Sequence, residues 1–171
     1  MANRVIESVR KWAGVGAGKI LKSDAGGLSD WVDLGQQISS SSGSFSTGST
    51  SFVDVTNLSV TITTTGRPVM LMLISDGTVD PYYCHLEASD GSSATAIVGF
   101  QFLRGVTVVC QQWLGISVGG TTSTITEVPV SSMSFIDVVV AGTYTYKMQA
   151  SAKVSGRSAM VYYAKLVAFE L

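Results

Sequence analysis

The sequence has few charged residues, and this shortage limits the partners that it can attract. Charged side chains make up 13% of the 171 residues, about half the share usual for a soluble domain. The formal net charge is −1 at pH 7, so no strong field draws nucleic acid or anionic lipid to the chain. Hydrophobic residues make up 46%, which is too many for general disorder. We expect a β-protein that covers part of its surface with partner subunits.

Long apolar runs are also missing. The longest, residues 68–74 (PVMLMLI), has the length of a buried strand and is far too short to cross a bilayer. The first twelve residues, MANRVIESVRKW, contain neither the apolar stretch of a signal peptide nor a lipidation motif. We therefore expect no membrane insertion, and we expect assembly in a cytoplasm rather than secretion.

The chain has only two cysteines, Cys84 and Cys110, and one histidine, His85. Two buried free thiols are the favoured interpretation for a chain made in the cytosol, with one disulfide as the alternative. Cys84 and His85 are neighbours, and neighbours on a strand point to opposite faces, so these two should not share a metal ion. We predict no metal site and no cofactor.

Catalytic motifs are absent as well. Residues 14–19 (GVGAGK) lack the spacing of a phosphate-binding loop, and no strand precedes them as a dinucleotide fingerprint requires. No serine lies in a G-x-S-x-G elbow, and a lone histidine on a strand is usually a surface or core residue. A glycosidase would need two facing carboxylates. We expect the acidic residues to lie mostly at turns: Asp54, Asp76, Asp80, Glu87, Asp90, Glu127, Asp137 and Glu170. We predict that the protein is not an enzyme.

The sequence does contain one helical pattern, near its start. Val5, Ile6, Val9 and Trp12 recur at helical spacing, and the glycines of AGVGAG (residues 13–18) end the pattern. It predicts a short amphipathic helix whose apolar stripe needs a partner surface. That surface is either the same helix in sister subunits or a socket on a larger particle.

After a polar spacer, residues 36–44 (QQISSSSGS), the apolar period changes to two. Leu58, Val60 and Ile62 alternate with polar residues, as in a half-buried strand. Similar runs follow at short intervals between turn sequences, and FLRGVTVV predicts a tight hairpin at Arg104 and Gly105. The pattern predicts an antiparallel jelly-roll β-sandwich of about eight to ten strands. It divides the chain into an arm, residues 1–38 (short helix plus hairpin-like segment), and a knob domain, residues 39–171.

A short echo also fits a jelly roll. The pattern Ser-Phe-apolar-Asp-Val occurs at residues 51–55 and again at residues 134–138. Two Greek-key halves would produce such a pair, and coincidence in a β-rich chain is the alternative.

Residues 18–35 (GKILKSDAGGLSDWVDLG) resemble a segment that recurs in bacteriophage tail-fibre and related appendage proteins. The matching positions are Gly18, Lys19, Leu21, Ser23, Asp24, Ala25, Gly27 and Trp31. The segment reads as a hairpin, which is marginally stable unless other surfaces bury it. Together with the helix it provides the predicted particle-anchoring residues, which are Val5, Ile6, Val9, Trp12, Ile20, Leu21 and Trp31.

Much of residues 43–171 resembles the compact trimeric jelly-roll knobs of phage fibres and capsid decorations, which are similar to C1q and tumour-necrosis-factor domains. The resemblance is one of pattern, carried by residues 52–77, residues 134–152 and the terminal VAFEL. It implies a homotrimer within a virion.

The resemblance leaves two functions open. The first is a short tail fibre or appendage that docks to baseplate, tail or capsid proteins and binds a host-surface glycan or protein. Its candidate receptor loops are residues 75–80, 89–93 and 119–124, with Asp76, Asp80, Asp90, Thr121 and Thr122. The second is a capsid cement or decoration protein without a receptor role. A secreted sugar-binding module is a third possibility, which would need an export signal.

Overall fold

The computed structural model describes residues 19–23, 29–33, 37–77, 85–89, 95–117 and 125–171. The chain divides into two compact units, Met1–Gln36 and Gln37–Leu171. In the first unit, strands β1 (Lys19–Ser23) and β2 (Ser29–Asp33) pair antiparallel, with Leu21 opposite Trp31. The two strands expected in this segment are therefore present. The helix predicted from Val5, Ile6, Val9 and Trp12 lies outside the described residues.

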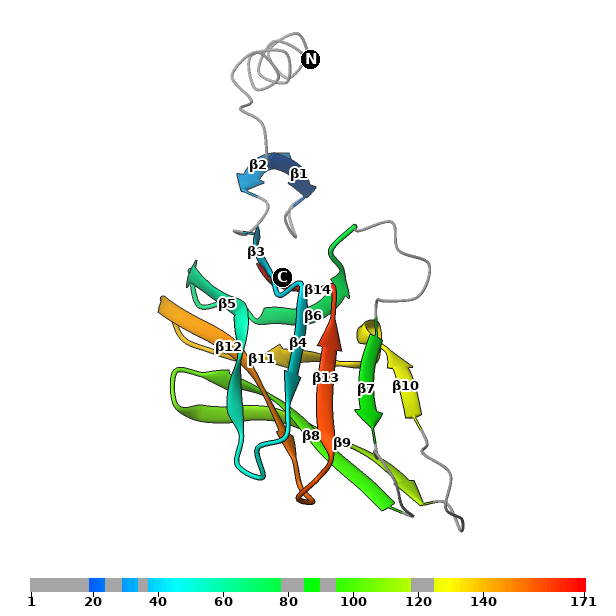
Figure 1. Cartoon of the computed structure of the whole chain (residues 1–171). Coiled ribbons are helices and arrows are strands. Elements are labelled where there is room, and N and C mark those ends of the chain that lie inside the picture. Colours follow the sequence, from blue (N-terminus) through cyan, green and yellow to red (C-terminus); the bar gives the residue numbers. More distant parts are fainter. Residues whose placement is uncertain (1–18, 24–28, 34–36, 78–84, 90–94, 118–124) are drawn as a thin grey trace, which may run out of the picture. The chain divides into compact units, whose positions relative to one another are not determined.

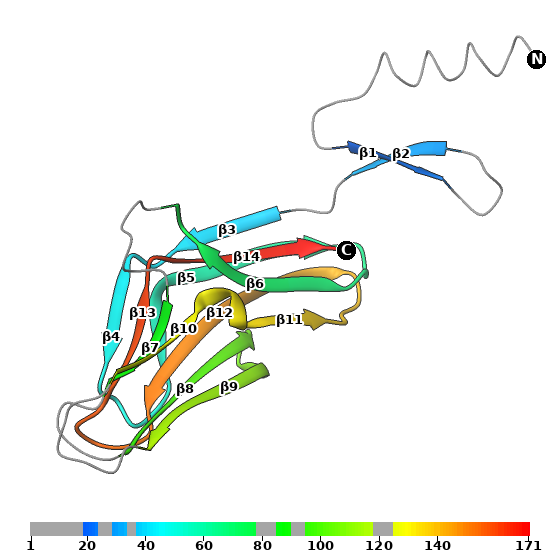
Figure 2. The same cartoon turned by 90° about the vertical axis from the view of Figure 1, so that its right-hand side faces the viewer.

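The regular structure described in the second unit consists almost entirely of antiparallel strands (Figures 1 and 2). They are β3 (Gln37–Ser41), β4 (Ser44–Thr47), β5 (Val53–Thr64), β6 (Val69–Ser75), β7 (His85–Ser89), β8 (Thr95–Arg104), β9 (Thr107–Ser117), β10 (Ile125–Pro129), β11 (Ser134–Asp137), β12 (Gly142–Ala152), β13 (Ser158–Tyr162) and β14 (Ala164–Glu170), with the 3₁₀ turn η1 (Val130–Ser132). Their sheet orders are β10-β7-β13-β4, β11-β6-β14-β3 and β5-β12-β8-β9. None of the described residues forms a helix long and apolar enough to span a bilayer.

The first two of these sheets are halves of one bent layer. The same four chain segments, β10–β11, β6–β7, β13–β14 and β3–β4, follow one another in the same order in both halves. At the bend the backbone bonding continues, since the N–H of Tyr163 donates to the carbonyl of Gly43 and the N–H of Asp76 donates to the carbonyl of Tyr163. Gly43 and Tyr163 both have left-handed backbone angles, with φ of 62° and 46°, which turn the chain there.

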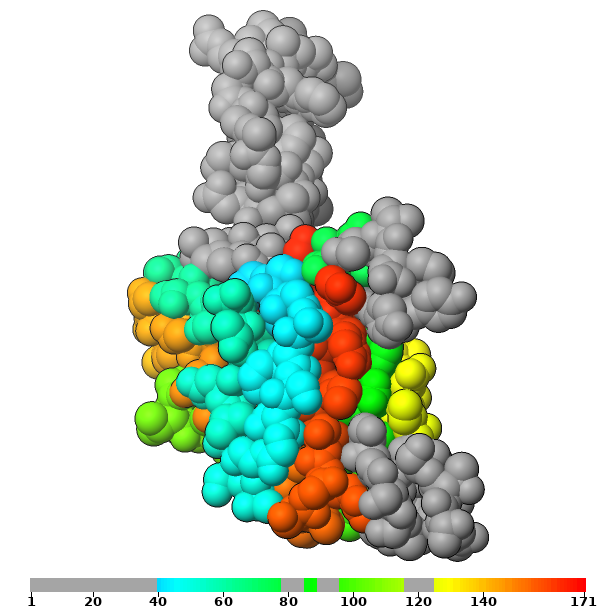
Figure 3. Space-filling view, viewed as in Figure 1, coloured from blue at the N-terminus to red at the C-terminus, as the bar shows by residue number. Residues whose placement is uncertain are grey.

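With each bent pair counted as one strand, the second unit is an eight-stranded jelly roll. The first strand (β3–β4) and the last (β13–β14) are neighbours, and consecutive strands alternate between the two layers except at the β8–β9 hairpin, in the manner of paired Greek keys. Figure 3 shows the resulting mixture on one face, where atoms from β4, β13, β7 and β10 lie side by side although the segments are far apart in sequence. The jelly-roll β-sandwich predicted from the sequence is confirmed.

The core lies between the two layers and is filled by the inward residues of each strand. Leu58, Val60 and Ile62 on β5 are buried, as their alternation predicted. Phe100, Phe102 and Tyr146, on the central strands β8 and β12, are among the largest fully buried side chains. Each large apolar side chain buried in this way contributes about 1.5–3 kcal/mol. The hairpin expected at Arg104 and Gly105 is also present, joining β8 to β9.

Residues 36–44, predicted to be a polar spacer, instead contain strand β3 and the first residue of strand β4. β3 pairs with β14, and β4 pairs with β13, each as the outermost strand of its sheet. An outermost strand needs only one hydrogen-bonded neighbour and can leave polar side chains in water, so pairing overrides the weak strand preference of serine. The prediction of a spacer was wrong because a run of serines shows no alternation of apolar and polar residues.

Candidate functional site

A row of aliphatic side chains is exposed on β11 and the segment after it. Ile136, Val138 and Val140 are 50%, 79% and 75% exposed, whereas the alternating residues Asp137 and Val139 are buried. The period of two therefore places three β-branched apolar side chains on the solvent side of one extended segment.

The row continues onto a neighbouring hairpin. β11 and β9 are outermost strands of their sheets and lie next to each other, and in Figure 2 β11 runs beside the β8–β9 hairpin. Val106 and Val108 of that hairpin are exposed as well. The surface that we call the apolar edge consists of Val106, Val108, Ile136, Val138 and Val140.

Polar contacts beneath the apolar edge hold its backbone in place. Nη1 of Arg104 donates to both carboxylate oxygens of Asp137, at 3.0 and 2.8 Å, and the Tyr146 hydroxyl donates to the same carboxylate at 2.8 Å. Burial, together with the bond to Asp137, raises the pKa of Tyr146, so this hydroxyl stays protonated and can donate. The Tyr144 hydroxyl donates to the carbonyl of Val140. These bonds tie the segment from Asp137 to Val140 to β8 and β12.

The part of the apolar edge on β11 and the segment after it has no exposed charged residue. Asp137 is the one charged residue in the stretch from 130 to 145, and it is buried. Outermost strands of soluble monomers are usually protected by charged side chains, because exposed apolar edges attract other chains. Exposed apolar side chains gathered on neighbouring strand edges without such protection form a candidate site of protein association.

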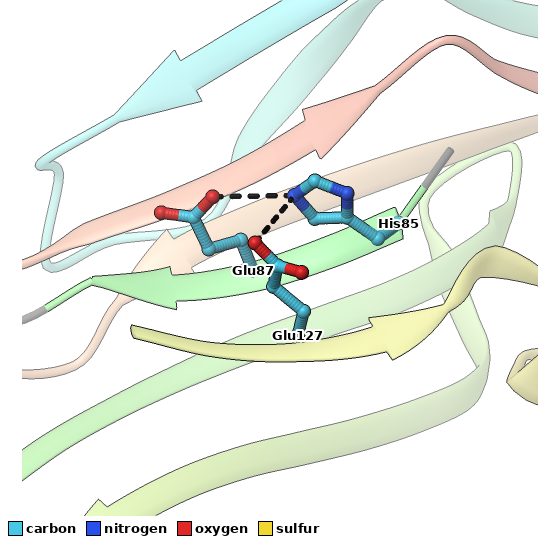
Figure 4. A group of neighbouring side chains, drawn as sticks. All are labelled: His85, Glu87 and Glu127. Atoms are coloured by element: carbon cyan, nitrogen blue, oxygen red, sulfur yellow. Dashed lines mark hydrogen bonds and ion pairs between the residues drawn. The ribbon is translucent and has the colours of Figure 1, made fainter. Parts of the chain in front are cut away.

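A polar cluster lies elsewhere, on the sheet β10-β7-β13-β4 (Figure 4). His85 and Glu87 are two residues apart on β7 and therefore point to the same face, opposite the fully buried Leu86 and Ala88. Glu127 on β10 is directly across from Glu87 in the strand register. Figure 4 shows both carboxylates turned toward one ring nitrogen of His85.

The distances within this cluster are short. Nε2 of His85 is 3.2 Å from Oε2 of Glu87 and 3.6 Å from Oε1 of Glu127. The side chains of His85 and Glu87 are each 8% exposed, whereas that of Glu127 is 54% exposed. The ring of Tyr162 on β13 packs against the imidazole, with centroids 4.8 Å apart. The cluster is therefore half buried, with one carboxylate at its outer side.

Sequence reasoning missed this cluster because it compared His85 only with its neighbour Cys84. The alternation of His85 and Glu87 was available, since residues two apart on a strand share a face. The approach of Glu127 was not, because it depends on the register of β10 against β7.

The prediction that acidic residues lie mostly at turns is wrong. Five of the eight lie on strands, namely Asp54, Glu87, Glu127, Asp137 and Glu170. Three of these, Glu87, Asp137 and Glu170, are buried. Buried carboxylates need donors or cations. Glu87 contacts His85 on its own strand, whereas the donors to Asp137 and Glu170 come from other parts of the chain. No local pattern could show them.

Most of the predicted site residues lie either on β1 and β2 or outside the described residues. Ile20, Leu21 and Trp31 lie on β1 and β2, for which the backbone pairing is described. Val5, Ile6, Val9, Trp12, Asp80, Cys84, Asp90, Thr121 and Thr122 lie outside the described residues.

Two further predicted residues can be placed. Asp76 lies at the bend of the layer, where it accepts a hydrogen bond from Ser41 at 3.0 Å. Cys110 is a half-buried free thiol whose pKa is raised by burial.

Comparison with known proteins gives little further information. No protein-family profile and no curated protein sequence matches the chain. Among solved structures, the chain is similar to infectious bursal disease virus of the Gt strain, with a TM-score of 0.38, 13% identity, and 92% of this chain and 44% of that chain covered. It is also similar to the VP2 subviral particle of the same virus, with a TM-score of 0.31, 13% identity, and 89% and 42% covered. The chain thus spans less than half the length of these proteins. Such low TM-scores do not establish a shared fold, and the jelly-roll assignment rests on the strand order.

Proposed function

We propose that this chain is a structural protein of a bacteriophage virion and that it acts as a homotrimer. In this proposal it is a short tail fibre or appendage. Its jelly-roll knob contributes to attachment to the host surface, and its N-terminal arm docks to other virion proteins. The role is non-covalent and needs no cofactor.

The apolar edge is the observation that carries the self-association. Five exposed aliphatic side chains occupy the side of the sandwich where the outermost strands of both layers meet. A second copy of the chain is the partner of matching chemistry, since an uncharged apolar row is covered best by another uncharged apolar surface. In a ring of three copies, each edge packs against the neighbouring copy and no edge remains in water.

Two further observations support the place in a virion. The jelly roll is an architecture of viral capsid and lectin domains, although fold alone does not determine function. The segment of residues 18–35 resembles a recurrent segment of phage appendage proteins, and its two strands pair as a hairpin. Three copies on one particle would let weak contacts with a receptor add up to firm attachment.

Light scattering of the purified full chain tests the assembly. The expected mass is three times the chain mass of 17.9 kDa, unchanged on dilution through the micromolar range. A folded, stable monomer would contradict the proposal. Immunogold electron microscopy of intact particles then tests the location, with gold at the tail expected. Gold spread over the head would instead identify a capsid cement or decoration protein without a receptor role.

A further inference from the structure

We propose that His85, Glu87 and Glu127 form a binding site for a divalent transition-metal ion, with Zn²⁺ as the best fit. This inference is independent of the virion function proposed above. It replaces the sequence-based expectation that the chain has no metal site.

The donor atoms already have the spacing of a coordination shell. Metal–ligand bonds of about 2.0–2.2 Å place neighbouring ligand atoms roughly 3 to 3.6 Å apart in tetrahedral or octahedral geometry. Nε2 of His85 lies 3.2 Å from the Glu87 oxygen and 3.6 Å from the Glu127 oxygen, and the three donor atoms lie within 4.8 Å of one another. Glu127 is the exposed member of the cluster, so its side chain can rotate to bring its carboxylate oxygen to the distance that a shared metal ion requires.

Among the three side chains of the cluster, negative charge exceeds positive charge. Two carboxylates converge on one imidazole nitrogen, and that nitrogen can carry only one proton. When Nε2 of His85 is a donor, it therefore forms a good hydrogen bond with only one of the two carboxylates. The other carboxylate then lies next to the negative charge of the first. As a metal ligand, the nitrogen offers its lone pair, and the two carboxylates together supply the −2 charge that a divalent ion neutralises.

Glu87 also has fewer partners than the other buried carboxylates. The carboxylate of Glu170 accepts four hydrogen bonds, and that of Asp137 accepts three. In the part of the chain that the structure describes, the contact with His85 is the one polar interaction of Glu87. A carboxylate with a side chain only 8% exposed normally has more partners than this, because burial removes its hydration. The deficit is what a bound cation would supply.

The ligand set indicates which ion would bind. One imidazole and two carboxylates are typical ligands of zinc, whereas Ca²⁺ takes six to eight oxygen ligands and Mg²⁺ keeps most of its water. Three protein ligands leave one position of a tetrahedral shell for water. Because β7 and β10 are paired strands, the ion would also clamp the outermost strand β10 to its neighbour.

Calorimetric titration of the tag-free, metal-depleted full chain with ZnCl₂ tests the site. One Zn²⁺ per chain is expected. The main variant is Glu127→Gln, because its exposed side chain can change without disturbing the core. Since loss of even an outer-shell partner costs about 10- to 100-fold in metal affinity, we expect this variant to bind Zn²⁺ at least 100-fold more weakly. Asp54→Asn, which changes an exposed carboxylate on β5, is the matched control and should bind as the wild type does.

A second experiment tests whether the cysteine thiols, rather than His85, Glu87 and Glu127, bind the metal ion. The Cys84→Ser/Cys110→Ser double variant should keep full affinity, and its Co²⁺ complex should show d–d absorption without a thiolate charge-transfer band. Three results would each overturn the proposal. They are no stoichiometric binding by the wild type, equal binding by Glu127→Gln, and loss of binding in the double serine variant. A monomeric protein that binds zinc would refute the trimer and leave this site intact.

Discussion

Gly99 on β8 lies directly opposite Trp113 on β9, and the indole ring occupies the space that a side chain at position 99 would need. A Cβ atom built on Gly99 would lie 2.7 Å from atoms of both Trp113 and Phe52. These two rings pack edge to face at 5.7 Å, and the amino group of Lys153 lies 5.0 Å from the indole centroid. The missing side chain thus lets an aromatic pair cover the outer face of this sheet.

Gly99→Ala should therefore destabilise the protein. Overpacking of a filled site costs about 1–3 kcal/mol, and we expect a loss of this size in urea unfolding. Gly115→Ala is the matched control, because it lies on β9 of the same sheet and a Cβ there would lie 3.9 Å from its nearest contacts on β8, Ala96 and Ile97. That variant should stay within about 0.5 kcal/mol of the wild type. If Gly99→Ala lowers the free energy of unfolding no more than Gly115→Ala does, the rings of Trp113 and Phe52 move aside freely and the prediction is wrong.

Loss of the Asp137 carboxylate should be costly. In Asp137→Ala the Tyr146 hydroxyl and the Arg104 guanidinium lose the carboxylate to which both donate. Because the carboxylate is buried and Arg104 is partly exposed, we expect a loss of about 2–4 kcal/mol in the free energy of unfolding. Asp54→Ala breaks an exposed ion pair with Lys147 and should cost less than about 1 kcal/mol. A smaller loss for Asp137→Ala than for Asp54→Ala would contradict this ranking.

Acid should weaken the fold partly through Glu170. Burial raises the pKa of this carboxyl, but hydrogen bonds from the hydroxyls of Thr64 and Thr65 and from the N–H groups of Thr65 and Arg67 outweigh burial and lower the pKa from 4.5 to about 2. A lowered folded-state pKa means that the stabilisation is fully present above pH 4.5 and is lost as the pH falls toward 2.

Urea unfolding at a series of pH values from 7 to 2 checks this sign. Glu170→Gln should be less stable than the wild type at pH 7, and the difference should shrink below about pH 4.5. The comparison with Glu170→Gln cancels the titration of the other carboxylates. A difference between the two proteins that stays constant across this range would show that the charge of Glu170 is not involved.

Val138→Glu should dissociate the proposed trimer. The side chain is 79% exposed in the single chain, so a charge there costs little before association and is buried without a partner after it. Light scattering should report a single-chain mass for this variant. Thr56→Glu, an exposed change on β5, should leave the mass unchanged. If Val138→Glu also keeps the wild-type mass, the apolar edge is not the interface.

Removal of residues 1–36 should leave the jelly roll folded, because every strand from β3 onward pairs within the second unit. The circular dichroism spectrum of the shortened chain should keep its β character, and its unfolding transition should remain cooperative. Incorporation into particles should be lost if the arm is the anchor. Normal incorporation of the shortened chain would refute the anchoring role of the arm.

The sequence by itself determined the class of fold, because alternation of apolar residues is a local property of a strand. The alternation of Leu58, Val60 and Ile62 predicted a half-buried strand, and the turn sequence at Arg104 and Gly105 predicted a hairpin. Both readings were correct, since neither depends on what the strand pairs with. The serine-rich strands β3 and β4 escaped this reasoning because their stability comes from β14 and β13.

Only the tertiary structure decided which polar groups meet. Three polar pairs illustrate this: Asp137 with Arg104, Glu170 with Thr64, and Glu127 with His85. In each pair the two residues are far apart in sequence, and the packing and register of their strands bring them into contact. The tertiary structure also decided that Ile136, Val138 and Val140 face water. A period of two shows that alternate residues of a strand share a face, but it does not show which of the two faces is buried. Pairing partners and the choice of the inner face are set by the packing of the whole sandwich, and no short stretch of sequence contains them.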